Sequence, residues 1–317
     1  MPWLIGIDEA GYGPNLGPLV MTAVACRVPN ELANADLWQL LAAAVRRPAE
    51  AADGRLLVAD SKVVYSRARG LAGLETGVFA LHPAASLPTL AQLTDRLCPT
   101  TAAELRAERW FSGHSPLPVA AAADELAAVA DRFTQASRGQ QVEWGLVRSV
   151  LVCPAHFNRM VDEHGSKGAV LGHGLAELLR ANLALAGREP MYFFIDKHGG
   201  RNTYAAMLQD AVPDGFVTAH EERPGRSTYR IASQGRELRL TFQPRADAAH
   251  FCVALASMVS KYLRELLMRE FNQFWQAHVP GLRPTAGYPA DAARFFQAIW
   301  PAARRLGLTE EALWRKR

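Results

Sequence analysis

Cysteine is scarce in this chain of 317 residues, and the few cysteines are widely spaced. They stand at positions 26, 98, 153 and 252, and no two form a Cys-x-x-Cys pair. This spacing argues against a disulfide framework or a zinc site and predicts buried free thiols. Apolar runs are also too short for a transmembrane helix, and the N-terminus lacks a signal peptide's basic flank and apolar core. We therefore expect a cytoplasmic protein with no membrane partner.

A strong excess of charge of either sign is also missing. The formal net charge is +4 and the sequence pI is about 9.0, which is compatible with a polyanionic partner but does not by itself indicate one. A solvated terminal helix explains the basic residues near the C-terminus as well as a nucleic-acid contact does: Arg304, Arg305, Arg315, Lys316 and Arg317. Hydrophobic residues make up 49% of the chain, which is ample for a sizeable core.

An apolar run at the N-terminus ends in two adjacent carboxylates. Residues 3–7 are typical of a short buried strand, and Asp8 and Glu9 follow it directly. Glycines at 11, 13 and 17 come next, and glycine lets a backbone approach a ligand closely. An isolated Asp-Glu pair would more often be a solvated strand end, and the glycine spacing is not that of a dinucleotide-binding loop. The whole string is typical of an active site.

Two further acids stand near the ends of predicted strands. Residues 191–195 are typical of a buried parallel strand, and Asp196 ends it before a turn. Three predicted strands follow, the last two joined as a hairpin around Gln234 and Gly235, and they lead to Asp247. A long helix is predicted after it, over 248–278. Four clustered carboxylates must share protons or bind cations, and their hard oxygens suit Mg²⁺ or Mn²⁺.

The first of these segments resembles a known motif. Asp8-Glu9-Ala-Gly11-Tyr12-Gly13-Pro, followed by Gly17-Pro-Leu-Val, is similar to the first motif of type 2 ribonucleases H, the ribonuclease HII family. Further segments follow in that family's order: Asp60-Ser61-Lys62, the strand that ends in Asp196, the run from Arg245 to Asp247, the helix with Ser257, Lys261, Arg264 and Glu265, and the segment around Tyr288.

The resemblance implies a ribonuclease-H-like α/β fold, in which a central mixed β-sheet is flanked by helices and carboxylates gather at one end. It covers about residues 1–62 and 142–300. We expect one catalytic domain over 1–317, with a mostly helical insertion at 66–140, where alanine is frequent. Residues 279–317 are expected to form a C-terminal helical extension that binds substrate.

The activity that the resemblance implies is metal-dependent hydrolysis of the RNA strand of RNA–DNA hybrids, or of ribonucleotide-containing DNA, to 3′-hydroxyl and 5′-phosphate ends. Two divalent ions, Mg²⁺ or Mn²⁺, would be held by the catalytic acids Asp8, Glu9, Asp196 and Asp247. No organic cofactor is expected, and the chain is expected to be monomeric. Substrate would contact Gly11, Tyr12, Gly13, Ser61, Lys62, Lys197, Ser257, Lys261 and Tyr288, while Arg245, Arg264 and Glu265 would support the acids.

The sequence departs from the family pattern in the glycine loop. Tyr12 stands where the family has arginine or lysine, so backbone reading of a 2′-hydroxyl can be retained but a cationic contact from this residue cannot. Lys197, Arg245 and Glu265 also replace the usual residues. Two other functions stay open: a nuclease of the same fold acting on structured or modified DNA, and a non-catalytic nucleic-acid-binding protein. The presence of all four acids argues against the second.

Overall fold

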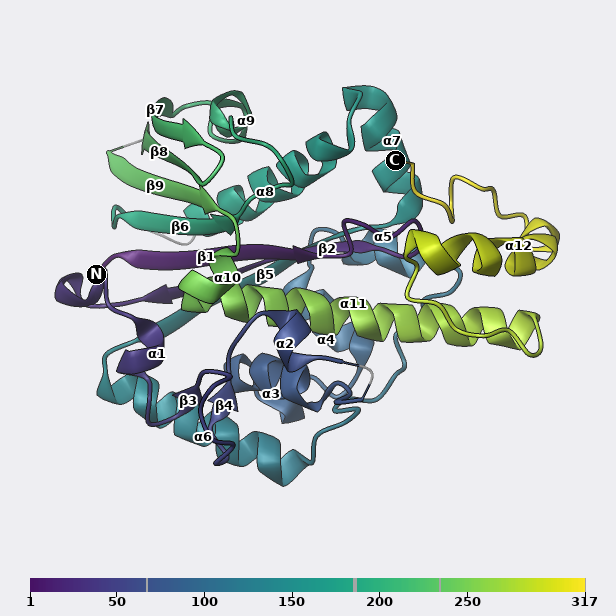
Figure 1. Ribbon diagram of the computed structural model, residues 1–317, viewed down its shortest axis with the longest axis horizontal. Helices are drawn as coiled ribbons and strands as arrows, with labels where there is room; N and C mark the ends of the chain where they lie inside the picture. The colour runs from purple at the N-terminus through teal and green to yellow at the C-terminus, as the bar shows by residue number, and fades with distance from the viewer. Residues whose placement is uncertain (67, 185–186, 234, 317) are drawn as a thin grey trace.

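The computed structural model describes residues 1–66, 68–184, 187–233 and 235–316, and its centre is a mixed β-sheet (Figure 1). The seven strands lie in the order β5-β2-β1-β6-β9-β8-β7. Parallel pairing joins β1 to β6 and β6 to β9, while the outer neighbours are antiparallel. The bounds are β1 Trp3–Ala10, β2 Leu19–Arg27, β5 Glu143–Val152, β6 Met191–Asp196, β7 Phe216–Arg223, β8 Arg226–Ser233 and β9 Arg236–Gln243.

Helices cover both faces of this sheet, which confirms the predicted fold class (Figure 1). One face carries α7 (Pro154–His164), α8 (Lys167–Leu183) and α9 (Ala205–Ala211). The other face carries α11 (Phe251–His278), and α12 (Pro289–Arg305) lies beside the end of α11. The described part of the chain has no helix that is long and apolar enough to cross a membrane.

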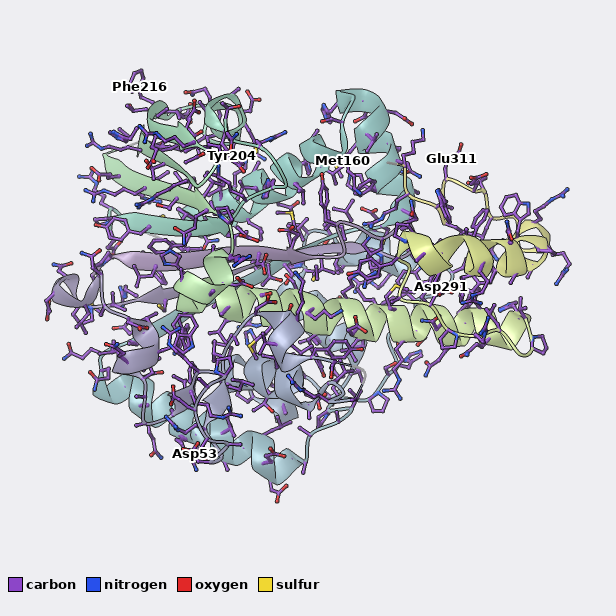
Figure 2. All side chains as sticks on the ribbon, viewed as in Figure 1. Asp53, Met160, Tyr204, Phe216, Asp291 and Glu311 are labelled. Carbon is purple, nitrogen blue, oxygen red and sulfur yellow. The ribbon has the colours of Figure 1, made fainter. Side chains whose placement is uncertain are left out.

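The alternation of side chains along β1 creates two separate cores, and side chains fill the space on both sides of the sheet (Figure 2). Leu4 joins the core beneath α11, whereas Ile5 and Ile7 join the core beneath α8. Gly6 lets α11 approach the sheet closely, since a Cβ there would lie 2.1 Å from the backbone of Cys252. The tight packing fixes the start of α11 against the strand that carries Asp8.

The residues between β2 and β5 form a subdomain that is mostly helical. It begins with α1 (Leu37–Leu40) and a two-stranded sheet of β3 (Val45–Arg46) and β4 (Leu56–Leu57), followed by α2 (Ser61–Val64). Within 66–140 the structure has four helices in its described residues: α3 (Ala72–Leu81), α4 (Leu90–Leu97), α5 (Ala102–Ala107) and α6 (Ala123–Gly139). Residue 67 of the predicted insertion lies outside the described residues, as do Gln234 and Arg317.

Two buried carboxylates fasten this subdomain to α11. The carboxylate of Glu75 on α3 accepts hydrogen bonds from the backbone N–H groups of residues 119–121 at 2.6–2.8 Å. It also accepts one from the Tyr262 hydroxyl at 2.5 Å. Glu270 of α11 accepts bonds from Ser112, Gly113 and Ser115 at 2.7–3.0 Å. Both side chains are almost fully buried, so each satisfies loop donors that water cannot reach.

We expect Glu75→Gln to destabilise the protein. The amide would turn a donor toward the N–H groups that the carboxylate satisfies, and the cost should be about 2 kcal/mol of unfolding free energy. Urea unfolding monitored by circular dichroism measures it. Glu125→Gln on the exposed side of α6 is the matched control and should change the unfolding free energy little. Equal midpoints for the two variants would contradict the anchoring role of Glu75.

The long C-terminal helix begins later than the sequence predicts. Residues Ala246–Ala249 form a separate short helix, α10, and His250 is extended before α11 starts at Phe251. Arg245 enters α10 in the left-handed conformation, with φ of 56°. The prediction of one helix over 248–278 was therefore wrong at its start, because a backbone turn that the helical pattern does not reveal interrupts it. Asp247 lies on this separate turn.

Candidate active site at the ends of the parallel strands

The four predicted acids lie at the carboxyl edge of the parallel strands. The β1–β6 pairing runs as far as Ile7 and Ile195, and Asp8 and Asp196 follow these residues directly. Glu9 comes next on β1, and Asp247 lies on α10 just after β9, which is paired with β6. Carboxyl ends of parallel strands meet at one edge of a sheet, so the fold itself gathers these side chains.

Burial raises the pKa values of all four acids, and repulsion from neighbouring acids adds to this increase in Asp8, Glu9 and Asp247. Burial first and Glu9 second hold the pKa of Asp8 well above its usual range, against a hydrogen bond from Ser257 that lowers it. Burial and the charge of Asp196 raise the pKa of Glu9 to about 7. The pKa of Asp196 is raised by burial, and that of Asp247 by burial and by the charges of Asp60 and Asp196. The folded chain therefore makes each of the four acids harder to ionise than it is in water.

The ammonium group of Lys62 faces the acids. It lowers the pKa values of Glu9, Asp196 and Asp247, against the larger effect of burial. Asp60 caps α2 by accepting the N–H of Lys62 at 2.9 Å, and Ser61 and Ser257 are buried with their hydroxyls 3.1 Å apart. Asp60 is an acid that we did not expect at the site, although it belongs to the Asp-Ser-Lys motif.

The donor set suits a hard divalent cation. Within the described ranges, no three acid, histidine or cysteine side chains are arranged to hold a metal ion as they stand. One buried and three partly buried carboxylates with raised pKa values are nevertheless the ligands that Mg²⁺ or Mn²⁺ takes, because a cation offsets both the repulsion and the lost hydration. The chemistry of the residues present therefore fits such an ion.

Backbone and side-chain contacts orient the remaining predicted residues near Asp196. The carboxylate of Asp196 accepts a hydrogen bond from the N–H of Ala246 at 3.2 Å. A backbone hydrogen bond from Arg245 also lowers the pKa of Asp196, although burial outweighs the two bonds. The side chain of Arg245 is exposed, so this residue supports the acid through its backbone. Lys197 is buried and donates to Asn202 at 2.9 Å and to the carbonyl of Arg223 at 2.5 Å, which secures the loop after β6.

Two buried guanidinium groups shape the glycine loop. Gly11 has φ of +93°, and a Cβ there would lie 2.4 Å from Nε of Arg264. Arg264 donates to the carbonyl of Ala286 at 2.9 Å, and Arg315 donates to the carbonyls of Gly11 at 2.6 Å and Pro14 at 3.0 Å. Burial and the nearby Arg264 lower the pKa of Arg315 to about 9. The loop conformation thus depends on cations from the C-terminal third of the chain.

For Arg315, the structure excludes a solvated terminal helix, one of the two explanations that the sequence left open. Its side chain is 1% exposed, and it packs over Phe157 with 4.7 Å between guanidinium carbon and ring centre. The residues after α12 are not helical but return to the glycine loop, where the Arg315 N–H donates to the carbonyl of Asn15 at 2.8 Å. No local signal in the sequence marks this arginine, because its partners lie about 300 positions earlier.

We expect Arg315→Met to lower the efficiency of the hybrid cleavage that the sequence resemblance implies about tenfold, because the unpaired carbonyls would let the glycine loop leave its position. Arg304→Met, on the exposed face of α12, removes the same charge and should leave kcat/KM unchanged. Kinetics on a labelled hybrid measure the effect, with circular dichroism to show that both variants are folded. Wild-type kcat/KM in Arg315→Met would show that the clamp does not position the loop.

A basic groove of about 920 Å³ lies between α11 and residues 283–294. Lys261 lies in it, 2.5 Å from Glu265 and 4.7 Å from the centre of the Tyr65 ring, and Tyr65 donates to Glu265 at 3.0 Å. The Tyr288 ring is 48% exposed and borders Gly13, since a Cβ at Gly13 would lie 3.6 Å from it. Three arginines complete the lining: Arg269, Arg283 and Arg294.

Comparison with protein-family models gives no match, and neither does comparison with curated protein sequences. Three solved structures are similar to this chain. An RNase HII of Archaeoglobus fulgidus, solved as a complex with PCNA, is 14% identical, with 99% of this chain and 94% of that chain covered and a TM-score of 0.44. The ribonuclease H2 of Pyrococcus horikoshii is 13% identical, with 98% and 92% covered and a TM-score of 0.46.

The third is Bst-RNase HIII, solved in complex with Mn²⁺, which is 17% identical, with 99% of this chain and 66% of that chain covered and a TM-score of 0.42. All three proteins are ribonucleases H by name, and each is less than 20% identical to this chain.

Proposed function

We propose that this protein is a divalent-metal-dependent endonuclease that hydrolyses the RNA strand of RNA–DNA hybrids, and ribonucleotides embedded in DNA, to leave 3′-hydroxyl and 5′-phosphate ends. The observation that carries the proposal is the gathering of Asp8, Glu9, Asp196 and Asp247 around Lys62 at one sheet edge. Buried like charges are costly and need a cationic partner. Divalent ions bound by the acids would supply this positive charge. The basic groove would bring the phosphates of a polyanion to them.

The four acids would hold Mg²⁺ or Mn²⁺ through their carboxylate oxygens. When bound, such ions supply Lewis-acid stabilisation of the charge that develops on the scissile phosphate and make a nearby water more acidic. Asp8 and Asp196 lie on adjacent parallel strands, so the pairing of β1 with β6 fixes their relative position. Ser257 donates to Asp8 and backbone N–H groups donate to Asp196, and these bonds orient the carboxylates.

The protein's cations would hold the nucleic acid on either side of the scissile bond. Lys62 would contact the phosphate itself, and the groove lined by Arg269, Arg283 and Arg294 would receive the next part of the backbone. Glu265 holds the ammonium group of Lys261 beside Tyr65, so Lys261 meets a phosphate from a fixed position. The half-exposed ring of Tyr288 offers a face for a sugar or base.

The glycine loop would distinguish RNA from DNA. Arg315 donates to its backbone carbonyls and Arg264 packs against Gly11, and Gly11 and Gly13 have no side chains that keep a ribose away. A 2′-hydroxyl can both donate and accept hydrogen bonds, so rigid backbone groups beside the acids can select it. This recognition does not need a cationic side chain at position 12.

Cleavage of three labelled duplexes tests the proposal: an RNA–DNA hybrid, a DNA duplex with one ribonucleotide, and an all-DNA duplex, each with Mg²⁺, Mn²⁺ or EDTA. We expect metal-dependent cleavage of the first two, with 3′-hydroxyl products. Cutting of all-DNA but not of the hybrid would replace the proposal with a DNA nuclease. Binding of all three without cleavage in any metal would indicate a non-catalytic nucleic-acid-binding protein.

A further inference from the structure

The outer strands β8 and β9 present an exposed basic surface on the side of the sheet that faces α11. Side chains alternate along both strands, and those of Tyr229 and Leu240 join the core beneath α8. The side chains between them point the other way, and Arg226, Arg230 and Arg239 are exposed there. A hollow of about 520 Å³ lies over this surface. We call the surface that carries these three arginines the open face.

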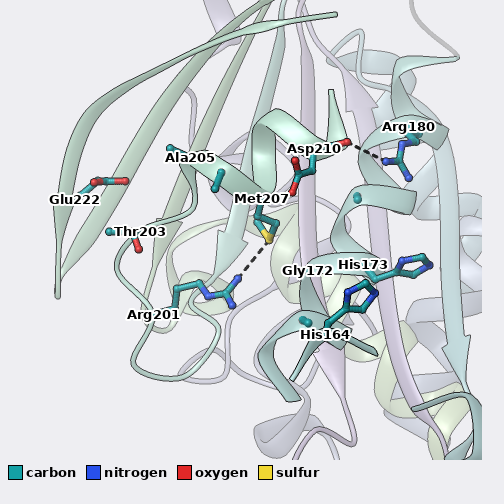
Figure 3. Close-up of a pocket in the computed structure, with 13 residues that line it drawn as sticks. His164, Gly172, His173, Arg180, Arg201, Thr203, Ala205, Met207, Asp210 and Glu222 are labelled. Carbon is teal, nitrogen blue, oxygen red and sulfur yellow. Dashed lines mark hydrogen bonds between the residues drawn. The ribbon is translucent and has the colours of Figure 1, made fainter. Parts of the chain in front are cut away.

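The opposite side of the sheet carries α8 and α9 and has no comparable excess of positive charge among its described residues (Figure 3). A cavity of about 640 Å³ between these helices is lined by two arginines and two acids: Arg180, Arg201, Asp210 and Glu222. Arg180 donates to the carbonyl of Asp210 at 3.2 Å, and Arg201 donates to the sulfur of Met207 at 3.6 Å. The open face is therefore the side of these strands that suits a polyanion.

The open face lies on the same side of the sheet as the candidate acids. Gly6, two residues before Asp8 on β1, packs against α11. Phe194, two residues before Asp196 on β6, stacks on His250, the residue before α11, with 3.9 Å between ring centres. Side chains two positions apart on a strand share a face, so Asp8 and Asp196 also point to the α11 side. One ligand can therefore contact the acids and the open face together.

The strand register sets the separation between the acids and the arginines. Asp196 pairs with Gln243 on β9, and Arg239 stands four residues before Gln243. Arg230 lies directly opposite Arg239 on β8. With about 3.3 Å per residue along a strand and about 4.8 Å between strands, both arginines lie about 15 Å from Asp196. A duplex covers this distance in about four or five base pairs.

Two like charges are held side by side on the open face. Arg230 and Arg239 form a directly opposed cross-strand pair, which is unfavourable by itself. Glu237 pairs with both, at 2.8 Å and 2.6 Å, and the Arg239 guanidinium lies 5.4 Å from the centre of the Tyr192 ring. The two arginine side chains remain 54% and 63% exposed. Three arginines and one acid line the hollow, so its net charge is positive.

We propose that the open face binds the sugar–phosphate backbone of the substrate duplex, about four or five base pairs from the cleaved phosphate. The proposal rests on the proposed function, because it gives that substrate a second contact surface. Figure 1 shows β8 and β9 on one side of α10, and α12 with the end of α11 on the other. The duplex would therefore extend from the groove along α11, across the acids, to the open face. Exposed guanidinium groups bind phosphates through charge-assisted hydrogen bonds, which position a duplex without reading its sequence.

Binding in EDTA tests this inference independently of catalysis. Fluorescence anisotropy would compare RNA–DNA hybrids of about 8 and about 20 base pairs, because the longer one can occupy the groove and the open face together. The test variant is Arg230→Gln/Arg239→Gln. The matched control is Arg132→Gln/Arg138→Gln, which removes two exposed arginines from α6 and changes the net charge equally. Circular dichroism shows whether both variants are folded.

We expect Arg230→Gln/Arg239→Gln to bind the longer hybrid about tenfold more weakly than the wild type, and the α6 control to bind it like the wild type. The plot of log affinity against log salt concentration should become shallower by about two for the test variant, since about one counterion is released per phosphate contact. The shorter hybrid should bind all three proteins within about twofold. Unchanged binding of the longer hybrid by the test variant, or an equal loss in the α6 control, would overturn the proposal.

The three-duplex cleavage assay separates this inference from the proposed function. Weaker binding of the longer hybrid by Arg230→Gln/Arg239→Gln, together with no cleavage of any duplex by the wild type, would refute the nuclease and support the open face as a nucleic-acid surface. Metal-dependent cleavage by the wild type, together with unchanged binding by the test variant, would support the nuclease. It would also refute the assignment of the open face to nucleic acid and favour an acidic protein as its partner.

Discussion

Asp196→Asn is expected to lower the rate of the proposed hybrid cleavage by about 10³-fold or more, because it removes a carboxylate that would hold a divalent ion and that interacts with Lys62. Asp8→Asn should have an effect of the same size. Neither change adds volume, and each removes one of the buried like charges, so the protein should stay folded. Single-turnover cleavage with Mg²⁺ measures the loss, and circular dichroism checks the fold.

Asp214→Asn is the control for that experiment. Asp214 is exposed in the turn between α9 and β7. Its replacement therefore removes an aspartate on the same side of β1 in the sheet as Asp196. Its activity should equal that of the wild type. Full activity in Asp8→Asn or Asp196→Asn would rule out the assignment of these acids as metal ligands.

The second large expected effect is that the free energy of unfolding depends on both pH and divalent ions. The folded protein raises the pKa of Glu9 from the ordinary 4.5 to about 7, so between these values it binds a proton that the unfolded chain has released. The ion-free protein should therefore lose stability as the pH rises through this window, and the loss from Glu9 alone is about 3 kcal/mol. The raised pKa values of Asp8, Asp196 and Asp247 act in the same direction.

Mg²⁺ or Mn²⁺ should reverse this loss, because ions bind the ionised acids of the folded chain. Urea unfolding at about pH 5 and about pH 8, in EDTA or in excess Mg²⁺, measures both terms. We expect stabilisation by Mg²⁺ to be large at the higher pH and small at the lower one. Asp8→Asn should be more stable than the wild type in EDTA at high pH and respond less to Mg²⁺. Sodium chloride at matched ionic strength is the control, and an equal effect of the two salts would contradict metal binding at these acids.

The strands and acids could be predicted because their signals are local. A buried strand such as β6 is a short apolar run with a polar end, and Asp196 stands at that end in both the sequence and the structure. Once β1, β6 and β9 are identified as parallel, the meeting of Asp8, Asp196 and Asp247 follows from the geometry of a sheet. The predicted roles of these residues stay predictions.

The contacts that position the site could not be predicted in the same way. Glu75 is an acid in an alanine-rich helix, and only the folded chain brings three N–H groups and Tyr262 to it. Lys197 donates hydrogen bonds to Asn202 and to the carbonyl of Arg223, and these bonds depend on how the β7–β8 hairpin folds back. Tertiary hydrogen bonds of this kind have no periodicity, so hydrophobic patterns do not reveal them.

The return of the chain's last residues to the glycine loop has a consequence for synthesis. Asn15 and Arg315 are bonded to each other through both backbone and side chain, and Arg315 also holds Gly11 and Pro14. During synthesis, Asn15 leaves the ribosome 300 residues before its partner Arg315. We therefore expect the glycine loop to stay without these hydrogen bonds until Arg315 has been made and can fold back onto it.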